Sequence, residues 1–518
     1  MQCTGFLFLV YFCCAGAYKI LVISPMPAKS HSILTDAIVK HLSSAGHEIT
    51  YVTVFIPEKP SPGVTIVDVS ENFKIFDQDE SINIKKVLDK TDESSSIRSM
   101  LSLIMNLGNR TLSNPNFQKL LSDKNEYFDV LIIEWMFTEV YAGLSNVYNC
   151  PYIWFSSVEP HWMILDLIDE SPNPSYNSDI TSDSVPPFTF LQRVKELSFQ
   201  ALGRLLRYYY TSSVEKQLYE EYLIPHIKSR GGEIFSLDTL KYNASLLLSN
   251  SHVSLGMPVR HPANFIPIGG YHIDSNVKPL PQNLQSIMDN ATHGVIYFSM
   301  GSNLRSNHFP DEIKQSLLKI FGKLNQTVLW KFEEDLPNRP SNVHILQWAP
   351  QQSILAHKNC KLFITHGGLL STTETIHFGV PIIGIPVFAD QYVNVDRSVK
   401  KGFAKRVYLS YTMASELHEA IIDILRDPKY TQRVKELSLI YHDRIATPDK
   451  ELIHWVEHVV KTRGAPHLRS LAFSVNWYQK IYLDLILVVT LIFTTAFFIL
   501  NYCFNFIKTK MVKKIKKN

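Results

Sequence analysis

The second half of this 518-residue chain alternates short apolar runs with amphipathic segments, and that alternation restricts the possible folds severely. The apolar runs, which have strand character, are GVIYFSMGS, TVLWKFE, VHILQW, KLFITHGG and PIIGIPVF. The segments with helical spacing are PDEIKQSLLKIFGKLN, QQSILAH, STTETIHFG and ADQYVNVDRSVKKG. Strands that alternate with helices form a parallel sheet with helices on both faces. The sequence therefore predicts a doubly wound α/β domain in this half.

The first half begins with the same pattern. KILVIS is predicted as a strand, ILTDAIVKHLSSAG as a helix closed by Gly46, and EITYVTVF, FDVLIIE and YIWFSS as further strands. Residues 160–235 are less regular: SPNPSYNSDITSDSVPPF is a polar, proline-rich loop, and the segment after it has helical spacing. A chain of this length accommodates two such domains. The predicted divisions are a signal peptide at 1–17, a first domain at 18–257, a linker at 258–284, a second domain at 285–440, helices at 441–476, a transmembrane helix at 481–507 and a basic tail at 508–518.

Both ends of the chain carry signals of membrane targeting. The first 17 residues contain an apolar run and end in Ala15-Gly16-Ala17, typical of a cleaved signal peptide, with a buried first strand as the alternative. The apolar run 485–506 would form roughly 33 Å of helix, enough to cross a bilayer, with a buried core helix as the alternative. The lysines that follow it are Lys508, Lys510, Lys513, Lys514, Lys516 and Lys517. By the positive-inside rule that tail is cytosolic and the bulk of the chain lumenal or extracellular.

Charge and cysteine content exclude some classes of protein. Of 51 Lys and Arg six lie in the tail, so the rest of the chain is slightly acidic against 48 Asp and Glu, and no nucleic-acid face is expected. Cys150 and Cys360 are the two cysteines left on the oxidising side, which is no disulfide framework. The predicted glycosylation sites, all on the lumenal side, are Asn109, Asn243, Asn290 and Asn325.

Several polar residues follow predicted strands, where parallel sheets bind their ligands. His31, Ser302 and His366 each lie on such a loop. Gly367-Gly368 lets a ligand approach the backbone at the start of a helix, whose unpaired N–H groups suit phosphate. A diphosphate would fit there, although an ordinary tight turn gives the same local pattern.

WAPQQSIL, THGGLLSTTE and FGVPIIGIPVFADQ follow one another between residues 348 and 391. This succession resembles the signature of the UDP-glycosyltransferase family, membrane-anchored enzymes that conjugate sugars to small lipophilic molecules, an activity typical of detoxification. GGLLSTTE and FADQ are most similar to its insect branch. The resemblance implies two facing Rossmann-like domains of GT-B type, with the 441–476 helices packing back toward the first. It also implies a single-pass type I protein of the endoplasmic reticulum, with lumenal catalytic domains. The last residues, KIKKN, resemble a K-x-K-x-x retrieval signal, and a stop-transfer tail is the alternative.

The resemblance also implies roles for residues of the second half. Trp348 would stack on uracil, Gln351 would contact the base or ribose, and Glu374 would bind the ribose hydroxyls. The diphosphate would be held by Gly301, Ser302, His366, Gly367, Gly368 and Ser371, and the sugar hydroxyls by Asp390 and Gln391. Alternatively, Trp348 is a core aromatic and Glu374 or Asp390 a helix-cap charge. Many relatives have Asn where this chain has Leu370, which puts the diphosphate contacts in question.

In the first half, His31 resembles the catalytic histidine of the family, and imidazole suits general-base work near neutral pH. Glu134 stands where the family usually has Asp, the acid that orients such an imidazole. A single displacement by an acceptor hydroxyl would invert the anomeric centre and give a β-glycoside and UDP. UDP-glucose is favoured over UDP-glucuronate. Arg260 is the candidate cation for a sugar carboxylate, but it lies about one position away from the place that the family's alignment gives such a cation. The acceptor pocket would come from residues 60–235, where Tyr208, Tyr209 and Tyr210 are core or pocket wall.

The expected partners are a UDP-sugar, a small lipophilic acceptor and a membrane, with oligomers possible and no cofactor beyond the donor. A catalytically weak nucleotide-sugar-binding protein is the alternative function. His454 and His458 match the zinc pattern H-x-x-E-H, but their neighbours favour a packed helix, and no metal site is predicted. Asp77-Gln78-Asp79 resembles a metal-binding DxD motif, but a solvated loop is favoured.

Overall fold

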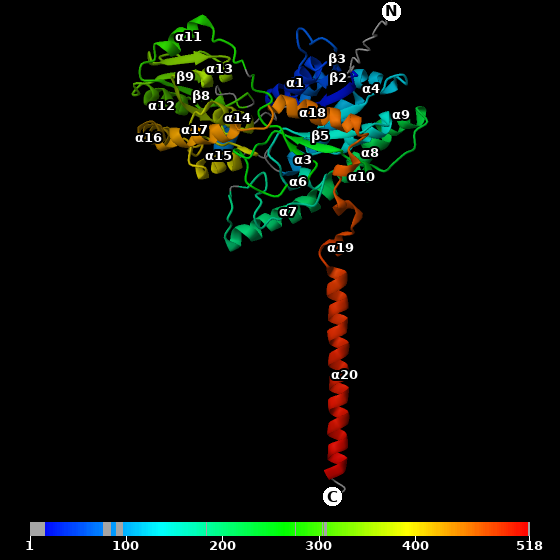
Figure 1. The fold of residues 1–518 in the computed structure, drawn as a ribbon. Helices are drawn as coiled ribbons and strands as arrows, with labels where there is room; N and C mark the ends of the chain where they lie inside the picture. The colour runs from blue at the N-terminus through cyan, green and yellow to red at the C-terminus, as the bar shows by residue number, and fades with distance from the viewer. Residues whose placement is uncertain are drawn as a thin grey trace, which may run out of the picture. The chain divides into compact units, whose positions relative to one another are not determined.

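The computed structural model describes residues 16–75, 84–89, 97–182, 184–274, 276–302, 304 and 308–515. Almost all of the predicted signal peptide, the Asp77–Asp79 motif and the last three residues therefore lie outside the described residues. The described chain forms two units, residues up to Leu468 and residues from Arg469 onward. The first unit contains two parallel sheets (Figure 1), so the predicted fold class is confirmed.

The sheet of the first domain has the strand order β3-β2-β1-β4-β5-β6-β7, and every strand pair in it is parallel. Its strands are β1 (Lys19–Ser24), β2 (Glu48–Thr53), β3 (Val64–Asp68), β4 (Val130–Glu134), β5 (Tyr152–Ser156), β6 (Leu246–Ser249) and β7 (Phe265–Pro267). The helices of this domain are α1 (Lys29–Ser44), α2 (Ile84–Leu88), α3 (Ile97–Ser113), α4 (Pro115–Ser122), α5 (Leu144–Tyr148), α6 (Trp162–Leu165), α7 (Phe190–Tyr210), α8 (Ser212–Tyr222), α9 (Ile224–Ser229) and α10 (Leu237–Leu240). Strand β7 lies inside the segment predicted as linker. It was not predicted because three residues are too few for a periodic pattern.

The sheet of the second domain repeats this topology in the order β10-β9-β8-β11-β12-β13. Its strands are β8 (Val295–Ser299), β9 (Thr327–Lys331), β10 (Val343–Leu346), β11 (Cys360–Thr365), β12 (Ile382–Gly384) and β13 (Ala404–Arg406). The remaining helices are α11 (Gln282–Asp289), α12 (Asp311–Phe321), α13 (Gln351–Ala356), α14 (Leu369–Phe378), α15 (Gln391–Lys400), α16 (Met413–Arg426), α17 (Lys429–His442), α18 (Pro448–Lys461), α19 (Trp477–Lys480) and α20 (Leu483–Ile515). In both sheets the strand order reverses beside the first strand, and ligands bind at such a switch point.

The apolar strands are buried on both faces, as a doubly wound sheet requires. One face of the first sheet packs around Leu131 and Trp154, and the other around Ile132 and Ile153. Two further clusters cover the faces of the second sheet.

Each domain also contributes a helix to the other. The buried side of α18, formed by Leu452, Val456 and Val459, joins the cluster on the first sheet although α18 follows the second domain in sequence (Figure 1). In return, Ile84 of α2 is buried in a cluster of the second domain. The two domains are therefore joined by exchanged helices as well as by the linker.

The second unit contains α20, which is long and apolar enough to cross a membrane over Leu483–Lys513. None of its apolar window is buried, which excludes the alternative of a buried core helix within the described residues.

Candidate functional site

The loop after β1 and the end of β4 meet at the switch point of the first sheet. His31 lies in the first turn of α1, and Glu134 is the last residue of β4. Nδ1 of His31 is 2.6 Å from Oε1 of Glu134, whose residue is 1% exposed. A carboxylate only accepts hydrogen bonds, so Nδ1 carries the proton, and Nε2 of the neutral imidazole keeps its lone pair. The structure thus brings together the two residues predicted as base and orienting acid.

The Glu134 side chain is held from its other side by a hydroxyl network. Ser24 Oγ donates to Glu134 Oε2 over 2.6 Å, and Thr35 Oγ1 donates to Ser24 Oγ over 3.2 Å. Thr35 also lies 2.8 Å from the Tyr51 hydroxyl. These contacts fix the longer Glu side chain in one position, so the extra methylene relative to Asp does not prevent the pairing.

The electrostatics of His31 favour its protonated form. Burial by itself would lower the pKa of His31, but the charge of Glu134, its hydrogen bond and the charge of Asp390 outweigh burial, so the pKa is raised above 6.5. Asp390 belongs to the second domain, so the two domains act electrostatically on the same imidazole. A raised pKa makes His31 a stronger base.

His366, at the switch point of the second sheet, lies between two glycines. A Cβ atom at Gly301 would be 2.5 Å from His366 Cε1, and one at Gly368 would be 2.6 Å from its Nε2. Gly301 also has φ +87°, a left-handed conformation that favours glycine. Burial, assisted by the positive charge of Lys331, lowers the pKa of His366 to about 4. This imidazole is therefore neutral at physiological pH and can donate one N–H.

Helix α14 begins directly after these glycines, and its first backbone N–H groups receive no side-chain cap, since Gly368 is the N-cap residue. Ser371 is buried in its first turn. Leu370 packs against the apolar cluster of the first sheet, which gives this residue a structural role between the domains. An anion at this helix start would meet the unpaired N–H groups and the partial positive charge of the helix.

The predicted nucleoside contacts gather beside α14. Gln351 Nε2 donates to Glu374 Oε2 over 2.6 Å, and Gln352 Nε2 donates to Oε1 over 3.1 Å. Burial raises the pKa of the Glu374 carboxyl to about 7 although both hydrogen bonds favour its charged form. Glu374 lies within α14, so it is not a helix cap. Trp348 is 62% exposed, so it is no core aromatic.

The predicted sugar contacts lie at the start of α15. Asp390 is the N-cap residue but its side chain makes no cap hydrogen bond; instead Asn394 Nδ2 donates to it over 2.7 Å. Burial raises the Asp390 pKa against the effect of that hydrogen bond. Gln391 Oε1 accepts hydrogen bonds from the backbone N–H groups of Val387 and Phe388, so only its amide nitrogen can serve a ligand.

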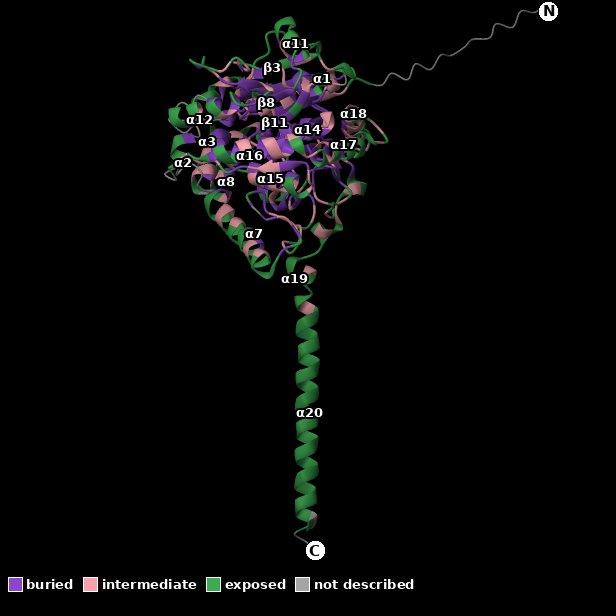
Figure 2. Cartoon of the chain, turned by 90° about the vertical axis from the view of Figure 1, so that its left-hand side faces the viewer, coloured by how far each residue is buried: buried purple, intermediate pink, exposed green. Residues whose placement is uncertain are grey.

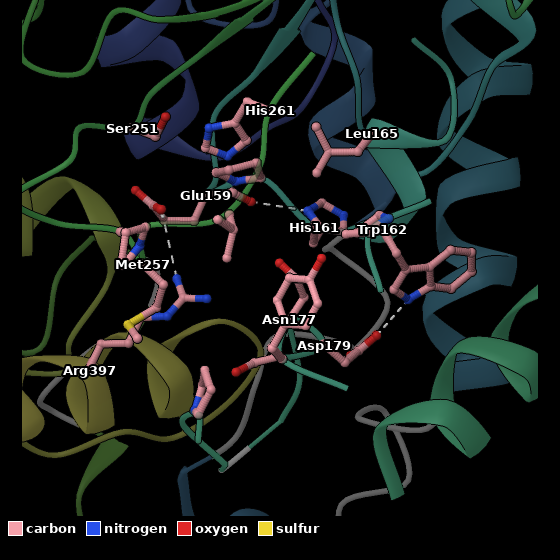
Figure 3. Close-up of a pocket in the computed structure, with 18 of the residues that line it drawn as sticks. Glu159, His161, Trp162, Leu165, Asn177, Asp179, Ser251, Met257, His261 and Arg397 are labelled. Atoms are coloured by element: carbon pink, nitrogen blue, oxygen red, sulfur yellow. Dashed lines mark hydrogen bonds and ion pairs between the residues drawn. The ribbon is translucent and has the colours of Figure 1, made fainter. Parts of the chain in front are cut away.

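A cavity of ≈110 Å³ opens between β5, the segment after β6, α7 and α15 (Figure 3). His161 and Glu159 follow β5, and Arg397 reaches in from α15 with its Nη1 3.8 Å from Glu159 Oε2. The rings of Trp135 and Phe137, which come just after Glu134, lie 5.4 and 6.1 Å from that of His161. The cavity therefore adjoins the strand that holds the predicted acid.

The polar atoms of this cavity have defined roles. His161 Nδ1 is 3.1 Å from the Glu159 carbonyl oxygen and must donate to it, so Nε2 is an acceptor, and it is buried without a partner. Burial lowers the pKa of His161 to about 4, which keeps the ring neutral. Burial raises the pKa of Glu159 to about 7 against the charge of Arg397. The remaining lining is largely apolar and includes Trp162, Leu165, Met257, Val259 and Phe265.

Some site residues were not predicted from the sequence. Lys331, the last residue of β9, donates to the Gly301 carbonyl over 2.8 Å and lies 6.0 Å from the Trp348 ring centroid. A lysine within the predicted strand TVLWKFE was the available signal. Gln352, Asn394, His161 and Arg397 had no signal of their own, because their roles depend on contacts between segments distant in sequence.

The exposure of side chains and the lining of the cavity bear on the residues predicted for the acceptor pocket and for a sugar carboxylate. Tyr208, Tyr209 and Tyr210 are exposed on α7, so they are neither core nor cavity wall. The cavity also extends beyond the predicted 60–235 segment, into residues 251–267 and to α15. Arg260 is exposed and does not line it.

The His454–His458 zinc pattern and the two cysteines predicted to be lumenal can be examined in the described residues. The described residues include no group of three or more His, Cys, Asp or Glu that could hold a metal ion, and Glu457 between the two histidines pairs with Lys461. Cys150 and Cys360 are both free thiols.

Solved structures with the same arrangement of two parallel-sheet domains identify the fold class of this chain. The calicheamicin glycosyltransferase CalG4 matches with a TM-score of 0.58 at 17% identity, over 87% of this chain and 100% of that one. A UDP-glucosyltransferase from Polygonum tinctorium matches with a TM-score of 0.56 at 15% identity, over 86% and 99%. Likeness at this identity concerns the fold, which is that of the GT-B glycosyltransferases.

Sequence comparison then gives the family. The model described as "UDP-glucoronosyl and UDP-glucosyl transferase" matches residues 18–518. UDP-glucosyltransferase 2 of Dactylopius coccus is 31% identical over 99% of this chain and 98% of that protein. The human 2-hydroxyacylsphingosine 1-beta-galactosyltransferase is 28% identical over 97% and 91%. The chain belongs to the UDP-glycosyltransferase family, as its motifs predicted.

Proposed function

We propose that this protein transfers glucose from UDP-glucose to a hydroxyl group of a small lipophilic acceptor, with inversion, forming a β-glycoside and UDP. The observation that carries the proposal is the 2.6 Å contact between His31 and the buried Glu134 carboxylate. It leaves Nε2 of His31 as a base of raised pKa between the two domains.

The reaction is a single displacement. His31 Nε2 removes the proton of the acceptor hydroxyl while the acceptor oxygen forms a bond to the anomeric carbon. The bond from that carbon to the diphosphate oxygen breaks, and UDP leaves with the bonding electron pair. The charge of Glu134 stabilises the imidazolium. Gly301, Ser302, His366, Gly367, Gly368 and Ser371 surround the place where the diphosphate would collect its negative charge, and Lys331 supplies a cation beside them.

The nucleoside and the sugar have separate contacts. Trp348 would stack on uracil, Gln351 would contact base or ribose, and Glu374 would accept hydrogen bonds from the ribose hydroxyls. Asp390 and the amide nitrogen of Gln391 would bind the sugar hydroxyls. The exposed position of Arg260 supports glucose over glucuronate, because a sugar carboxylate needs a cation within the site.

The cavity beside Glu134 supports an acceptor with an apolar body. Its apolar lining would contact that body, and the unpartnered His161 Nε2 would accept a hydrogen bond from a second polar group of the acceptor. The proposed location is the endoplasmic reticulum membrane, with α20 as a single type I span, the catalytic domains in the lumen and the lysine tail in the cytosol. The apolar α20 and the lysines after it support that topology.

The test uses microsomes that contain the full chain or its His31→Ala variant, supplied with UDP-glucose or UDP-glucuronate and a panel of phenols and sterols. We expect a glucose conjugate from the wild type, seen by mass spectrometry, and loss of nearly all turnover in the variant with UDP binding retained. UDP binding without turnover of either donor would instead favour a nucleotide-sugar-binding protein, with Leu370 in place of the usual amide as the first residue to revert to Asn.

A further inference from the structure

Helix α7 carries its polar and apolar sides in the reverse of the usual orientation. Its two buried residues are the polar Glu196 and Gln200, 1% and 9% exposed. Its large apolar side chains are instead exposed, and Figure 2 shows much of the helix accessible. We define the outer face of α7 as Phe190, Leu191, Val194, Leu197, Leu202, Leu205, Tyr208 and Tyr209. A helix on a soluble surface normally turns its apolar stripe inward.

The outer face is continuous along the whole helix. At 100° per residue its side chains fall within an arc of about 140°, and the other residues of that arc are the small Ser198 and Ala201. The arc contains no charged residue. A continuous apolar surface of this kind marks a site of contact with a partner or a membrane.

The borders of the outer face indicate a lipid surface. Arg193 and Lys195 lie on either side of it, and their cationic groups approach the rings of Phe190 and Phe199 at 5.9 and 5.5 Å. Long basic side chains that cover apolar surface while their charge reaches lipid phosphate are typical of helices in the membrane interface. Tyrosines concentrate at the same depth, and the outer face ends in Tyr208 and Tyr209.

The chain also supplies a reason for a bilayer to be near. The candidate span at Leu483–Lys513 is joined to the first unit by residues 469–482, which reach at most ~50 Å when fully extended. We propose that the outer face of α7 lies in the headgroup region of the bilayer that α20 crosses. This inference rests on the membrane anchoring proposed above.

The proposal also concerns the substrate. Glu196 and Gln200, on the buried side of α7, line the cavity assigned to the acceptor. A helix with lipid on one side and the cavity on the other brings that cavity next to the membrane, where lipophilic acceptors dissolve. The cavity then receives its substrate across a short distance from lipid.

The experiment measures lipid contact at single sites of the full chain in nanodiscs of phosphatidylcholine and phosphatidylserine. Cys503→Ser removes the exposed cysteine of α20, and the chain with no added cysteine gives the labelling background. A bimane label is placed at Leu205→Cys and, as the matched control, at Leu439→Cys, an exposed leucine of α17. We expect brominated lipids to quench the label at 205, roughly 5–10 Å into the interface, and aqueous iodide to quench the label at 439.

Two outcomes would overturn the proposal. Quenching by iodide at 205 as strong as at 439 would place the outer face in water. Protection from both quenchers, together with excimer formation by a pyrene label at 205, would show that a second copy of the chain covers it. Turnover of a water-soluble phenol is measured in the same samples, so failure of the proposed reaction is seen separately from failure of docking.

A second variant tests whether the apolar side chains cause the contact. With the label at Leu191→Cys, the added pair Leu202→Glu and Leu205→Glu should abolish lipid quenching, whereas Leu439→Glu should not. Both changes are at exposed positions outside the cavity, so UDP binding should be unchanged and reports an intact fold. Lipid quenching that survives the charged pair would show that the outer face does not hold α7 at the membrane.

Discussion

At the residue scale, the charge of Glu134 controls the basicity of His31. Glu134→Gln keeps the shape but removes the charge that raises the His31 pKa, so kcat should fall by roughly 10²–10⁴-fold. His31 must be neutral to act, so wild-type activity should fall as the pH drops through a value above 6.5. In the variant that acid limb should move to lower pH. Steady-state kinetics from pH 5 to 9 measure both effects.

The matched variant is Glu134→Asp, which keeps the charge but shortens the side chain. Its acid limb should stay above that of Glu134→Gln, with a smaller loss of rate caused by the longer distance to His31. Equal acid limbs in wild type and Glu134→Gln would contradict the pairing.

Lys331 should act on both the nucleotide and His366. Lys331→Met removes a cation beside the glycine turns and should weaken UDP binding by about 1.5–3 kcal/mol, the usual worth of a charged hydrogen bond. The positive charge of Lys331 also lowers the His366 pKa, so that pKa should rise from about 4 in the variant. Calorimetry measures the first effect and histidine NMR titration the second. Lys323→Met, at an exposed position, is the control and should change neither.

At the element scale, α18 should stabilise the first domain although the second domain precedes it in sequence. Leu452 is fully buried against the first sheet, so Leu452→Ala should cost about 2–5 kcal/mol of unfolding free energy. His454→Ala, on the exposed side of the same helix, should change it by less than about 0.5 kcal/mol. Denaturation in detergent micelles compares the two. A large effect of His454→Ala, reproduced by a zinc chelator, would favour the metal site instead.

The same scale shows which parts of the fold the sequence could predict. Long apolar strands such as β1, β4 and β11 and the amphipathic helix α12 were predicted closely, because each has a clear period or a continuous apolar run. Strands β7 and β13 have three residues each, too few for any period, and they join their sheets only through neighbouring strands. Helix α7 lies in a segment where only helical spacing was visible. Its period is clear, but the direction of its apolar side depends on tertiary contacts.

In the candidate site too, residues with a local sequence pattern were predicted and residues that depend on tertiary contacts were not. His366 and the glycines were predicted because they follow strands closely and lie in a family motif, whereas His31 and Glu134 were predicted from their resemblance to the family's catalytic pair. All of them lie near strand ends, which the switch-point geometry brings together. Arg397 pairs with Glu159, beside His161, only because the two domains face each other, and no local pattern encodes that contact.

At the scale of the whole molecule, the proposed orientation has consequences for glycosylation. The four sequon asparagines are all exposed, so each can carry a glycan in the folded protein. In microsomes, an endoglycosidase should therefore increase the mobility of the chain, and Asn243→Gln, Asn290→Gln or Asn325→Gln should each remove one step. Asn109 lies within α3 and the Thr111 hydroxyl donates to the Leu107 carbonyl, so glycan transfer there must precede formation of α3. Its occupancy should be the lowest of the four.

Protease protection of intact microsomes tests the same topology from the other side of the membrane. Trypsin should remove only the lysine tail, because the domains that precede α20 are enclosed in the lumen. Replacing Lys514 and Lys516 by Ser should leave this topology unchanged but let glycans mature beyond the endoplasmic reticulum if KIKKN acts in retrieval. A chain that shows no glycans and is degraded by trypsin without detergent would have its catalytic domains in the cytosol. That result would reverse the orientation while leaving the reaction at His31 and the bilayer contact of α7 to be judged by their own tests.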